Sequence, residues 1–404
     1  MTIVSRHVAP YAAPRLSTLP PLALYIHIPW CVRKCPYCDF NSHEARGELP
    51  EREYIAALIR DLECALPQVW GRRIVSVFFG GGTPSLLSAQ GVDAILSDAR
   101  ARLPLESDAE VTLEANPGTF EAARFRDYRA AGVNRLSIGI QSFNARHLKA
   151  LGRIHDDRQA RRAVDIARAT FENFNLDLMY GLPQQTLEEA CADVDAALEY
   201  APPHLSAYHL TIEPNTYFHR YPPQLPDDDT SAAMQAEVEA RLAARGYVHY
   251  EVSAFAQSAG RMCRHNLNYW TFGDYLGIGA GAHSKISSAQ GIVREMRYKQ
   301  PKEYMERVAR DAPVQSRREV SIDEVGFEFM MNALRLTSGF EARLFSERVG
   351  VPLTCLARQL DEAERKGLIE RDHRHIAPTA LGRRFLNDLL QMFLPAETTS
   401  PRWQ

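Results

Sequence analysis

The sequence predicts an α/β protein in which strands and helices alternate, followed by a small helical domain. Three observations support this prediction. Six apolar runs rich in β-forming residues recur between residues 22 and 212, helical patterns separate them, and after about residue 320 helical patterns predominate. Strand followed by helix, repeated about six times, is typical of parallel βαβ units, arranged either as an open sheet or as a (β/α) barrel.

The predicted strands are short apolar runs, several of which end in polar or glycine-rich residues. They are LALYIHI (22–28), IVSVFF (74–79), VTLEA (111–115), RLSIGIQS (135–142), FNLDLMYG (174–181) and HLSAYHLTI (204–212). Helical patterns between them cover residues 51–66, 89–103 and 158–174. Polar groups follow five strands, at His27, Gly80 to Thr83, Glu114 to Pro117, Gln141 and Asp177. Because parallel α/β folds place ligands at the carboxyl ends of strands, these residues predict one ligand-binding face rather than five separate helix caps.

The second half of the chain departs from this repeat. A turn-rich stretch over 221–231 leads into a predicted helix with Thr230 or Ser231 as its N-cap, and a strand-like run follows over 247–256. Beyond residue 320, three or four helices and a hairpin over 367–379 resemble a winged-helix module. Its charge is mixed, which favours a packing or partner-binding role over DNA binding. The predicted divisions are a flexible leader (1–20), a barrel (21–215), a barrel extension (216–315) and a C-terminal domain (316–404).

Composition excludes several classes of protein. The 404 residues include 45% hydrophobic and 24% charged residues, and the formal net charge is −3, so no broad positive field predicts a nucleic-acid partner. No apolar run is long enough to span a bilayer. The seven cysteines are an odd number, and three of them fall within eight positions, so a disulfide framework is not expected. The sequence therefore predicts a cytoplasmic protein.

Three cysteines, Cys31, Cys35 and Cys38, directly follow the first predicted strand. With His27 or His43 as a fourth ligand they would form a closed Cys₃His zinc site. Alternatively, the spacing suits three irons of a 4Fe-4S cluster and leaves the fourth iron open for a small molecule. Tyr37 precedes the third cysteine and would lie beside that open iron. The position of the loop at the ligand face favours the cluster.

The CxxxCxxC spacing with an aromatic residue before the last cysteine resembles the radical S-adenosylmethionine (SAM) superfamily. The resemblance implies a partial (β/α)6 TIM-type barrel and SAM as the fourth cluster ligand. Gly81, Gly82 and Thr83 match the motif that holds the methionine amino group in that superfamily. The other cofactor-binding candidates are Tyr25 and Tyr37, Glu114 for a cationic group of SAM, Arg153 for its carboxylate, and Gln141 and Asp177 for the ribose hydroxyls.

Further motifs resemble the HemN/HemW group within that superfamily. They include LYIHIPWCVRKCPYCDFNSH, FFGGGTPSLL, LEANPGT, GVNRLSIGIQSF, LGRIH, NLDLMYGLPQQT and HNLNYW, and they cover residues 22 to about 285. The group contains the oxygen-independent coproporphyrinogen III dehydrogenases, which carry a further cysteine two residues after the third, and the HemW-type haem chaperones. Here Phe40 occupies the position of that further cysteine, only 30 residues precede Cys31, and HNLNYW matches the HNxxYW motif of the chaperones. The resemblance therefore implies a haem chaperone, with a radical SAM dehydrogenase or another radical SAM enzyme as the alternative.

His265, the first residue of HNLNYW, is the candidate haem ligand. Tyr269 and Trp270 offer aromatic faces for a macrocycle, although a buried core histidine explains His265 equally well, and Cys263, His283 and His209 are other candidate ligands. The partners implied by the resemblance are haem as cargo and haem-accepting respiratory proteins at the membrane surface, with a homodimer left open. The expected cofactors are the 4Fe-4S cluster, SAM and haem.

Overall fold

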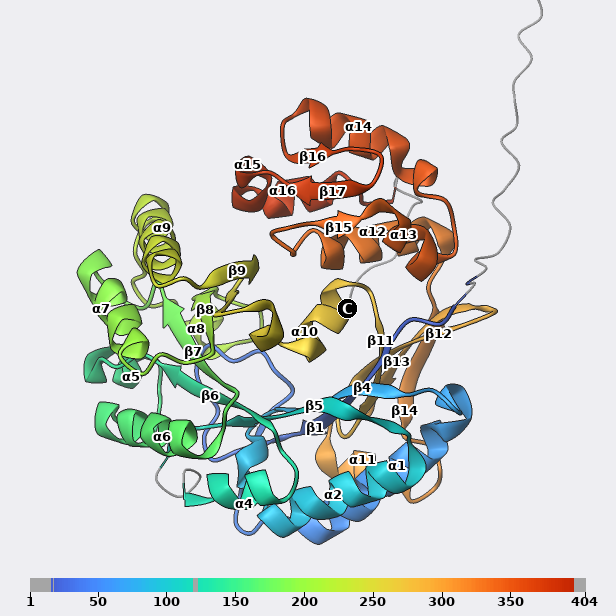
Figure 1. The fold of residues 1–404 in the computed structure, drawn as a ribbon. Helices are drawn as coiled ribbons and strands as arrows, with labels where there is room; N and C mark the ends of the chain where they lie inside the picture. The colour runs from blue at the N-terminus through green and yellow to red at the C-terminus, as the bar shows by residue number, and fades with distance from the viewer. Residues whose placement is uncertain (1–15, 17, 119–122, 396–404) are drawn as a thin grey trace, which may run out of the picture.

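The computed structural model describes residue 16 and residues 18–118 and 123–395, so most of the leader predicted for residues 1–20 lies outside the described residues. Its largest feature is a mixed sheet in which, beside a further parallel strand described below, the six strands of the predicted barrel run parallel (Figure 1). These are β1 (Leu22–Ile28), β4 (Ile74–Gly81), β5 (Leu105–Ala115), β6 (Arg135–Gln141), β7 (Phe174–Tyr180) and β8 (His204–His209). The prediction of a partial (β/α)6 barrel is confirmed.

Helices cover the convex face of this curved sheet, as Figure 1 shows. They are α1 (Glu51–Val69), α2 (Ala89–Arg102), α4 (Phe125–Ala130), α5 (Ala145–Ala150), α6 (Asp157–Thr170), α7 (Leu187–Leu198) and α9 (Asp228–Ala244). Short elements at the strand ends are β2 (Trp30–Cys31), β3 (His43–Glu44), a 3-10 turn η1 (Pro84–Leu86) and α8 (Tyr217–Arg220). Most positions of these strands are buried, between helices on one face and packed side chains on the other, which explains their apolar sequences; the start of β5 and the end of β8 are exposed.

Additional strands extend the sheet at both edges. At the β8 edge lie β10 (Ala254–Ala256) and β9 (Val248–Glu251), and at the β1 edge lie β11 (Asp274–Ile278), β12 (His283–Ser288), β13 (Gly291–Arg297) and β14 (Val314–Glu319). The single strand expected over 247–256 is wrong, because the chain turns at Val252–Ser253 and β9 pairs antiparallel with β10. The expected N-cap at Thr230 or Ser231 is also wrong: α9 begins earlier, and the Asp227 side chain accepts a hydrogen bond from the Thr230 amide at 2.8 Å.

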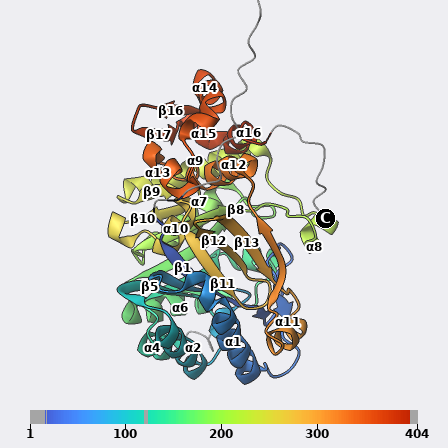
Figure 2. The ribbon, with the colours of Figure 1, turned by 90° about the vertical axis from the view of Figure 1, so that its right-hand side faces the viewer.

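The C-terminal region forms a winged module above the barrel (Figures 1 and 2). It comprises α12 (Ile322–Ala333), β15 (Phe340–Glu341), α13 (Ala342–Val349), η3 (Leu353–Leu356), α14 (Ala357–Arg365), β16 (Ile369–Arg371), β17 (His375–Pro378), α15 (Ala380–Arg384) and α16 (Leu386–Gln391). β15, β17 and β16 form a three-stranded sheet, and Phe329 packs edge-on against Phe340 and Phe345 in the core of the module.

The segment between barrel and winged module contains η2 (Ala259–Arg261), α10 (Arg264–Trp270) and α11 (Pro301–Val308). Figure 1 places α10 on the concave side of the sheet, below the winged module. Phe272, just after α10, belongs to the core of the winged module, and the Arg335 guanidinium lies 4.4 Å from the Trp270 ring centre. No helix in the described part of the chain is long and apolar enough to cross a membrane.

Candidate functional site

The three cysteines of the motif lie on one loop at the carboxyl end of β1. Pairing of β2 with β3 closes this loop, because Trp30 and Cys31 are in register with His43 and Glu44. Within it, the Cys38 amide donates to the Cys35 carbonyl at 3.1 Å, and the Cys38 sulfur lies 3.7 Å from the Ser42 hydroxyl. Residues 31–43 form the cluster loop, a name used below. It brings all three predicted metal ligands, each half-buried, to the face where the parallel strands end.

The surroundings of these thiols favour a positively charged partner. Burial raises the pKa of Cys31, the neighbouring Cys38 and Cys35 raise it further, and hydrogen bonds with Thr83 and Ser42 lower it. Burial likewise raises the pKa of Cys38. Three crowded thiols ionise together only when a metal group supplies the compensating charge. A 4Fe-4S cluster takes its ligands from such a set, so the residues present fit this cofactor.

A zinc site was the alternative for the same cysteines. Among residues 16, 18–118 and 123–395, no three His, Cys, Asp or Glu side chains surround one point closely enough to hold a single metal ion. His27, one proposed fourth ligand, donates to or accepts from Tyr25 through Nδ1 at 3.1 Å, while its Nε2 lies 2.9 Å from the Asn41 carbonyl. Both ring nitrogens of His27 are therefore engaged by the protein, and zinc is the less favoured hypothesis.

The glycine-rich end of β4 packs tightly against the first strand. Gly81 has φ +111°, and a Cβ there would lie 2.5 Å from the His27 ring. A Cβ on Gly82 would lie 2.5 Å from the Trp30 carbonyl oxygen, and the Gly82 amide donates to the Ile28 carbonyl at 2.7 Å. These glycines thus allow β4 to approach β1 and the cluster loop. The packing of the protein itself therefore requires glycine at both positions, whether or not a ligand contacts them.

Thr83, the next residue, is buried beside Cys31. Its hydroxyl accepts a hydrogen bond from the Asn116 amide at 3.0 Å and interacts with the Cys31 sulfur. Asn116 also accepts a hydrogen bond from Arg153 at 2.6 Å. Asn116 therefore connects two predicted site residues. The LEANPGT motif contains it, but only its position between Thr83 and Arg153 reveals this role.

Arg153 points toward the cluster loop. One of its terminal nitrogens (Nη2) donates to the Gly139 carbonyl at 2.8 Å, and the other (Nη1) lies 3.6 Å from the Cys35 sulfur. Its Nε is buried and has no hydrogen-bond partner among the described residues. The guanidinium is thus held in place beside the thiols, and its Nε–H group has no acceptor in the described part of the chain. This arrangement suits an incoming carboxylate.

Two carboxylates, Glu114 on β5 and Asp177 on β7, face the same barrel interior. Burial and, to a smaller extent, the nearby Asp177 raise the pKa of Glu114 to about 8, although a hydrogen bond from the Gly81 amide lowers it. Burial also raises the pKa of Asp177, which accepts hydrogen bonds from Ser137 at 3.1 Å and from Asn175 at 2.8 Å. A cationic ligand would favour the ionised form of Glu114.

The remaining candidates for cofactor binding border the same interior. Gln141 ends β6 with φ +68°, and its side-chain nitrogen packs with Arg153 over Gly139. The Tyr25 ring lies 6.3 Å from the Phe78 ring and covers Gly80. Tyr37 interacts with Cys35 and lies 6.5 Å from Phe218 on α8. The structure therefore gathers the predicted cofactor-binding residues other than His265 around the strand ends.

His265 lies on α10, inside the concave side of the sheet, with its ring centre 6.2 Å from that of Tyr25. It is 4% exposed, its Nδ1 is 3.1 Å from the Ser76 hydroxyl, and its ring stacks on Phe78 at 4.8 Å. Burial lowers the pKa of His265 to about 3, with a further contribution from Arg135. These are the surroundings of a core histidine, and haem would reach its ring only after α10 moved.

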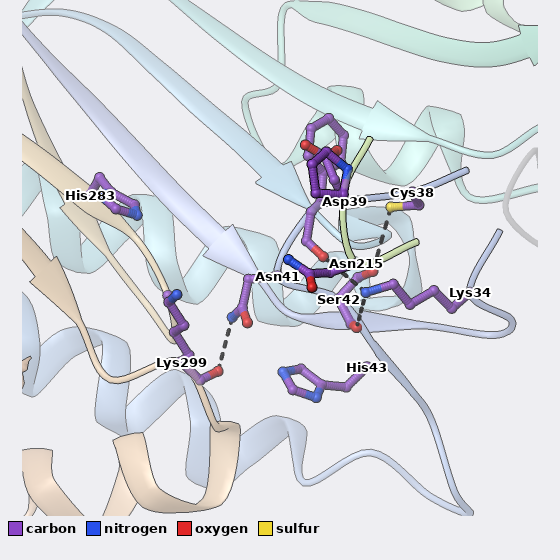
Figure 3. A pocket seen from close by; sticks show the side chains of 12 residues that line it. Lys34, Cys38, Asp39, Asn41, Ser42, His43, Asn215, His283 and Lys299 are labelled. Carbon is purple, nitrogen blue, oxygen red and sulfur yellow. Dashed lines mark hydrogen bonds between the residues drawn. The ribbon is translucent and has the colours of Figure 1, made fainter. Parts of the chain in front are cut away.

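A pocket of about 480 Å³ lies beside the cluster loop (Figure 3). Its walls come from that loop, from Pro214 and Asn215 after β8, and from Gly281, His283 and Lys299 around β12 and β13. The pocket therefore lies where the loop after β1 meets the segment after β8 and the residues around β12 and β13. Sequence reasoning missed Lys34, Asn41 and Lys299, because their proximity depends on the β11 to β14 extension.

The chain matches two known protein families. Residues 25–197 match the radical SAM superfamily, and residues 320–385 match the HemN C-terminal domain. The chain is 49% identical to "Heme chaperone HemW" of Escherichia coli (strain K12) over 93% of this chain and 99% of that protein. It is 46% identical to "Heme chaperone HemW" of Haemophilus influenzae over 94% of this chain and 99% of that protein.

Among solved structures, coproporphyrinogen III oxidase (HemN) from Escherichia coli, described as a radical SAM enzyme, is similar with a TM-score of 0.79. The match covers 93% of this chain and 90% of that chain at 24% identity. At this identity the likeness shows the fold alone. It confirms the predicted combination of a radical SAM barrel with a small C-terminal module.

Proposed function

The chain belongs to the HemW family of the radical SAM superfamily, and on this basis we propose that it is a haem chaperone. It holds a 4Fe-4S cluster on Cys31, Cys35 and Cys38, binds SAM as the fourth cluster ligand, and transfers haem to acceptor proteins. It acts in the cytoplasm, and at the membrane surface during delivery to respiratory acceptors. The barrel (21–215) carries the cluster, and the extension (216–315) and the winged module (316–404) complete the protein.

The observation that carries this proposal is the convergence of the three thiols with Arg153 on one face. When bound, the cluster would supply an iron that the amino and carboxylate groups of SAM can chelate, and a source of one electron. Arg153, held by Asn116 and Gly139, pairs with the carboxylate of the ligand. Glu114 receives a cationic group, and Asp177 with Gln141 orients the ribose. Tyr37 shields the open iron from solvent.

Anaerobic reconstitution tests the cluster. We expect about four irons and four sulfides per chain and an electronic spectrum that changes when SAM is added. Cys38→Ser should lose the SAM-responsive spectrum, whereas Cys355→Ser, which alters a thiol of the winged module, should retain it. A normal SAM-responsive cluster in Cys38→Ser would contradict the proposed ligand set.

The competing function is oxidative decarboxylation of coproporphyrinogen III. Phe40, at the position where the dehydrogenases carry a further cysteine, is 60% exposed on the cluster loop and provides no ligand. Reduced, reconstituted protein should therefore bind haem but form no decarboxylated product from coproporphyrinogen III and SAM. Sustained product formation over many turnovers would replace the chaperone proposal with an enzymatic one.

A further inference from the structure

Asn116 lies between the two sides of the candidate cofactor site. It directly follows β5, and its side chain is half-buried. The side-chain oxygen (Oδ1) accepts a hydrogen bond from Arg153 Nη2 at 2.6 Å, and the side-chain nitrogen (Nδ2) donates to the Thr83 hydroxyl at 3.0 Å. Arg153 Nη1 lies 3.6 Å from the Cys35 sulfur, and Thr83 is hydrogen-bonded to the Cys31 sulfur. One amide therefore joins the groups that adjoin two of the three cysteines.

We propose that Asn116 is a positioning residue for the binding of SAM. It holds the Arg153 guanidinium in the orientation that meets the methionine carboxylate. It also directs the proton of the Thr83 hydroxyl to the Cys31 thiolate. This role rests on the cofactor binding proposed above, and Asn116 performs it through Arg153 and Thr83. Loss of one amide would therefore change two measurable properties, the affinity for SAM and the reduction potential of the cluster.

The chemistry of its partners fixes the orientation of the Asn116 amide. A guanidinium carries donors and no acceptor, so it faces Oδ1, and Nδ2 therefore faces Thr83. Nδ2 occupies an acceptor position of the Thr83 hydroxyl, which has a single proton of its own to donate. Thr83 is 2% exposed, so this proton is shielded from solvent, and the Cys31 sulfur accepts it. The chain of hydrogen bonds thus runs in one direction, from the guanidinium to the sulfur.

Arg153 depends on Asn116 for its position. Two neutral oxygens hold Nη2, that of Asn116 at 2.6 Å and the Gly139 carbonyl at 2.8 Å. No carboxylate of the described residues forms an ion pair with Arg153, so its charge is available to a ligand. Without Asn116 a single carbonyl would hold this nitrogen. The guanidinium would then lose part of the pre-orientation on which carboxylate binding depends.

The Thr83 end of the chain acts on the cluster. A hydrogen bond donated to a cluster thiolate stabilises negative charge, and therefore favours the reduced state over the oxidised state. Asn116 determines which acceptor the Thr83 proton reaches, because it occupies the other side of the hydroxyl. Loss of Asn116 would therefore lower the reduction potential of the cluster.

SAM titration of the full-length, cluster-loaded protein, followed by its electronic spectrum, tests the Arg153 end. Asn116→Ala should raise the dissociation constant for SAM about tenfold or more at unchanged cluster iron content, because the guanidinium is no longer held. Arg153→Met should weaken SAM binding at least as much. Adding Asn116→Ala to Arg153→Met should cause little further loss, since Asn116 acts through Arg153. Asn332→Ala is the matched control, because this half-buried asparagine donates to the Glu328 carbonyl at 2.7 Å in the winged module.

Redox titration of the SAM-free cluster tests the Thr83 end. Thr83→Val, which removes the hydroxyl at nearly constant volume, should lower the potential, and Thr83→Ser should restore it. Asn116→Ala should shift the potential in the same direction as Thr83→Val. Asn116→Ser, which keeps a hydrogen-bonding group, takes the place of Asn116→Ala if that variant does not assemble the cluster, and should show the same shifts at smaller size.

Unaltered SAM affinity and potential in Asn116→Ala would overturn this role while leaving the proposed cofactors standing. A loss of affinity in the double variant equal to the product of the two single losses would also overturn it. A lower iron content alone, with normal affinity and potential in the clusters that form, would show a structural role and overturn it too. A cluster that does not respond to SAM in the unaltered protein would overturn the proposed function itself.

Discussion

At the scale of single residues, the site depends on groups whose ionisation the fold has changed. Glu114 is the clearest example, because burial raises its pKa to about 8 from an ordinary value of 4.5. The folded, ligand-free protein therefore binds a proton at Glu114 that the unfolded chain has already lost near neutral pH. This contribution to stability is complete below about pH 4.5 and disappears as the pH rises through about 8.

Glu114→Gln should remove this pH dependence. Between pH 5 and pH 8 the ligand-free protein should lose roughly 2–5 kcal/mol of unfolding free energy that the variant retains, because glutamine is always neutral. Chemical denaturation at each pH, followed by circular dichroism, measures the difference. Asp108→Asn, at an exposed position of β5, is the matched control. Parallel pH profiles for the unaltered protein and Glu114→Gln would show that Glu114 is ionised when folded.

Gly81 provides a steric test at the same scale. Gly81→Ala should prevent cluster assembly, because the new Cβ meets the His27 ring at 2.5 Å in addition to the unfavourable φ of +111°. Gly47→Ala is a matched control, since Gly47 has φ +86° but no atom within 4 Å of the added Cβ. Gly47→Ala should cost only about 1 kcal/mol of stability and retain the cluster. Both variants carry backbone strain, but only Gly81→Ala adds a steric clash. The iron content of the two reconstituted variants therefore distinguishes the two effects.

The sequence revealed which residue types belong to the site but not how they are joined. Cys31, Cys35 and Cys38 were predictable because their spacing is local, and Glu114 and Asp177 because the ends of parallel strands converge. Arg153, in the turn between α5 and α6, was predicted from the LGRIH motif. Asn41 was not predictable, since its partners, Ala280 and Lys299, lie more than 230 residues away. The role predicted for His265 stays a prediction, and its burial depends on how α10 packs against β4.

At the scale of elements, α9 shows where local reasoning failed. The N-cap expected from the sequence is Thr230 or Ser231, and Asp227, the first residue of the acidic run before them, is not among the expected caps. The structure starts the helix at Asp228, with the Asp227 side chain bonded to the Thr230 amide. The strands of the barrel were easier to predict, because burial on both faces leaves long apolar runs between turn residues.

Replacement of the cap tests this boundary. Asp227→Ala should lower the melting temperature, because the amides of the first turn lose their acceptor. Ser231→Ala, which lies one turn inside the helix, should leave the melting temperature nearly unchanged or slightly raise it. Calorimetry of the two variants compares them directly, and a larger decrease for Ser231→Ala would place the cap where the sequence suggested.

At the scale of the whole molecule, barrel and winged module have separate apolar cores. Phe329 is completely buried in the core of the winged module, against Phe272, Phe340 and Phe345. Phe272 comes from the segment that follows α10, so the two bodies meet at the HNLNYW sequence. The winged fold was predictable from its helix and hairpin order, but this junction was not.

Phe329→Ala should destabilise the winged module by about 3–5 kcal/mol through loss of a buried ring. The cluster loop lies on the barrel and has no residue in the core of the winged module, so the iron content of the reconstituted variant should equal that of the unaltered protein. Denaturant unfolding followed by fluorescence, together with iron analysis, measures both quantities. Loss of the cluster alongside the winged module would show that the two cores unfold as one unit.

The burial of α10 also determines how fast a ligand can arrive. A haem bound through His265 would wait for the helix to leave Ser76 and Phe78, a unimolecular opening whose rate is independent of haem concentration. Association would then level off as haem is increased. Binding at a ligand already open to solvent would need no such opening, and its observed rate would rise in proportion to haem. Rapid-mixing measurements of the association rate at increasing haem concentration therefore distinguish a buried binding site, which must open first, from one that is open to solvent.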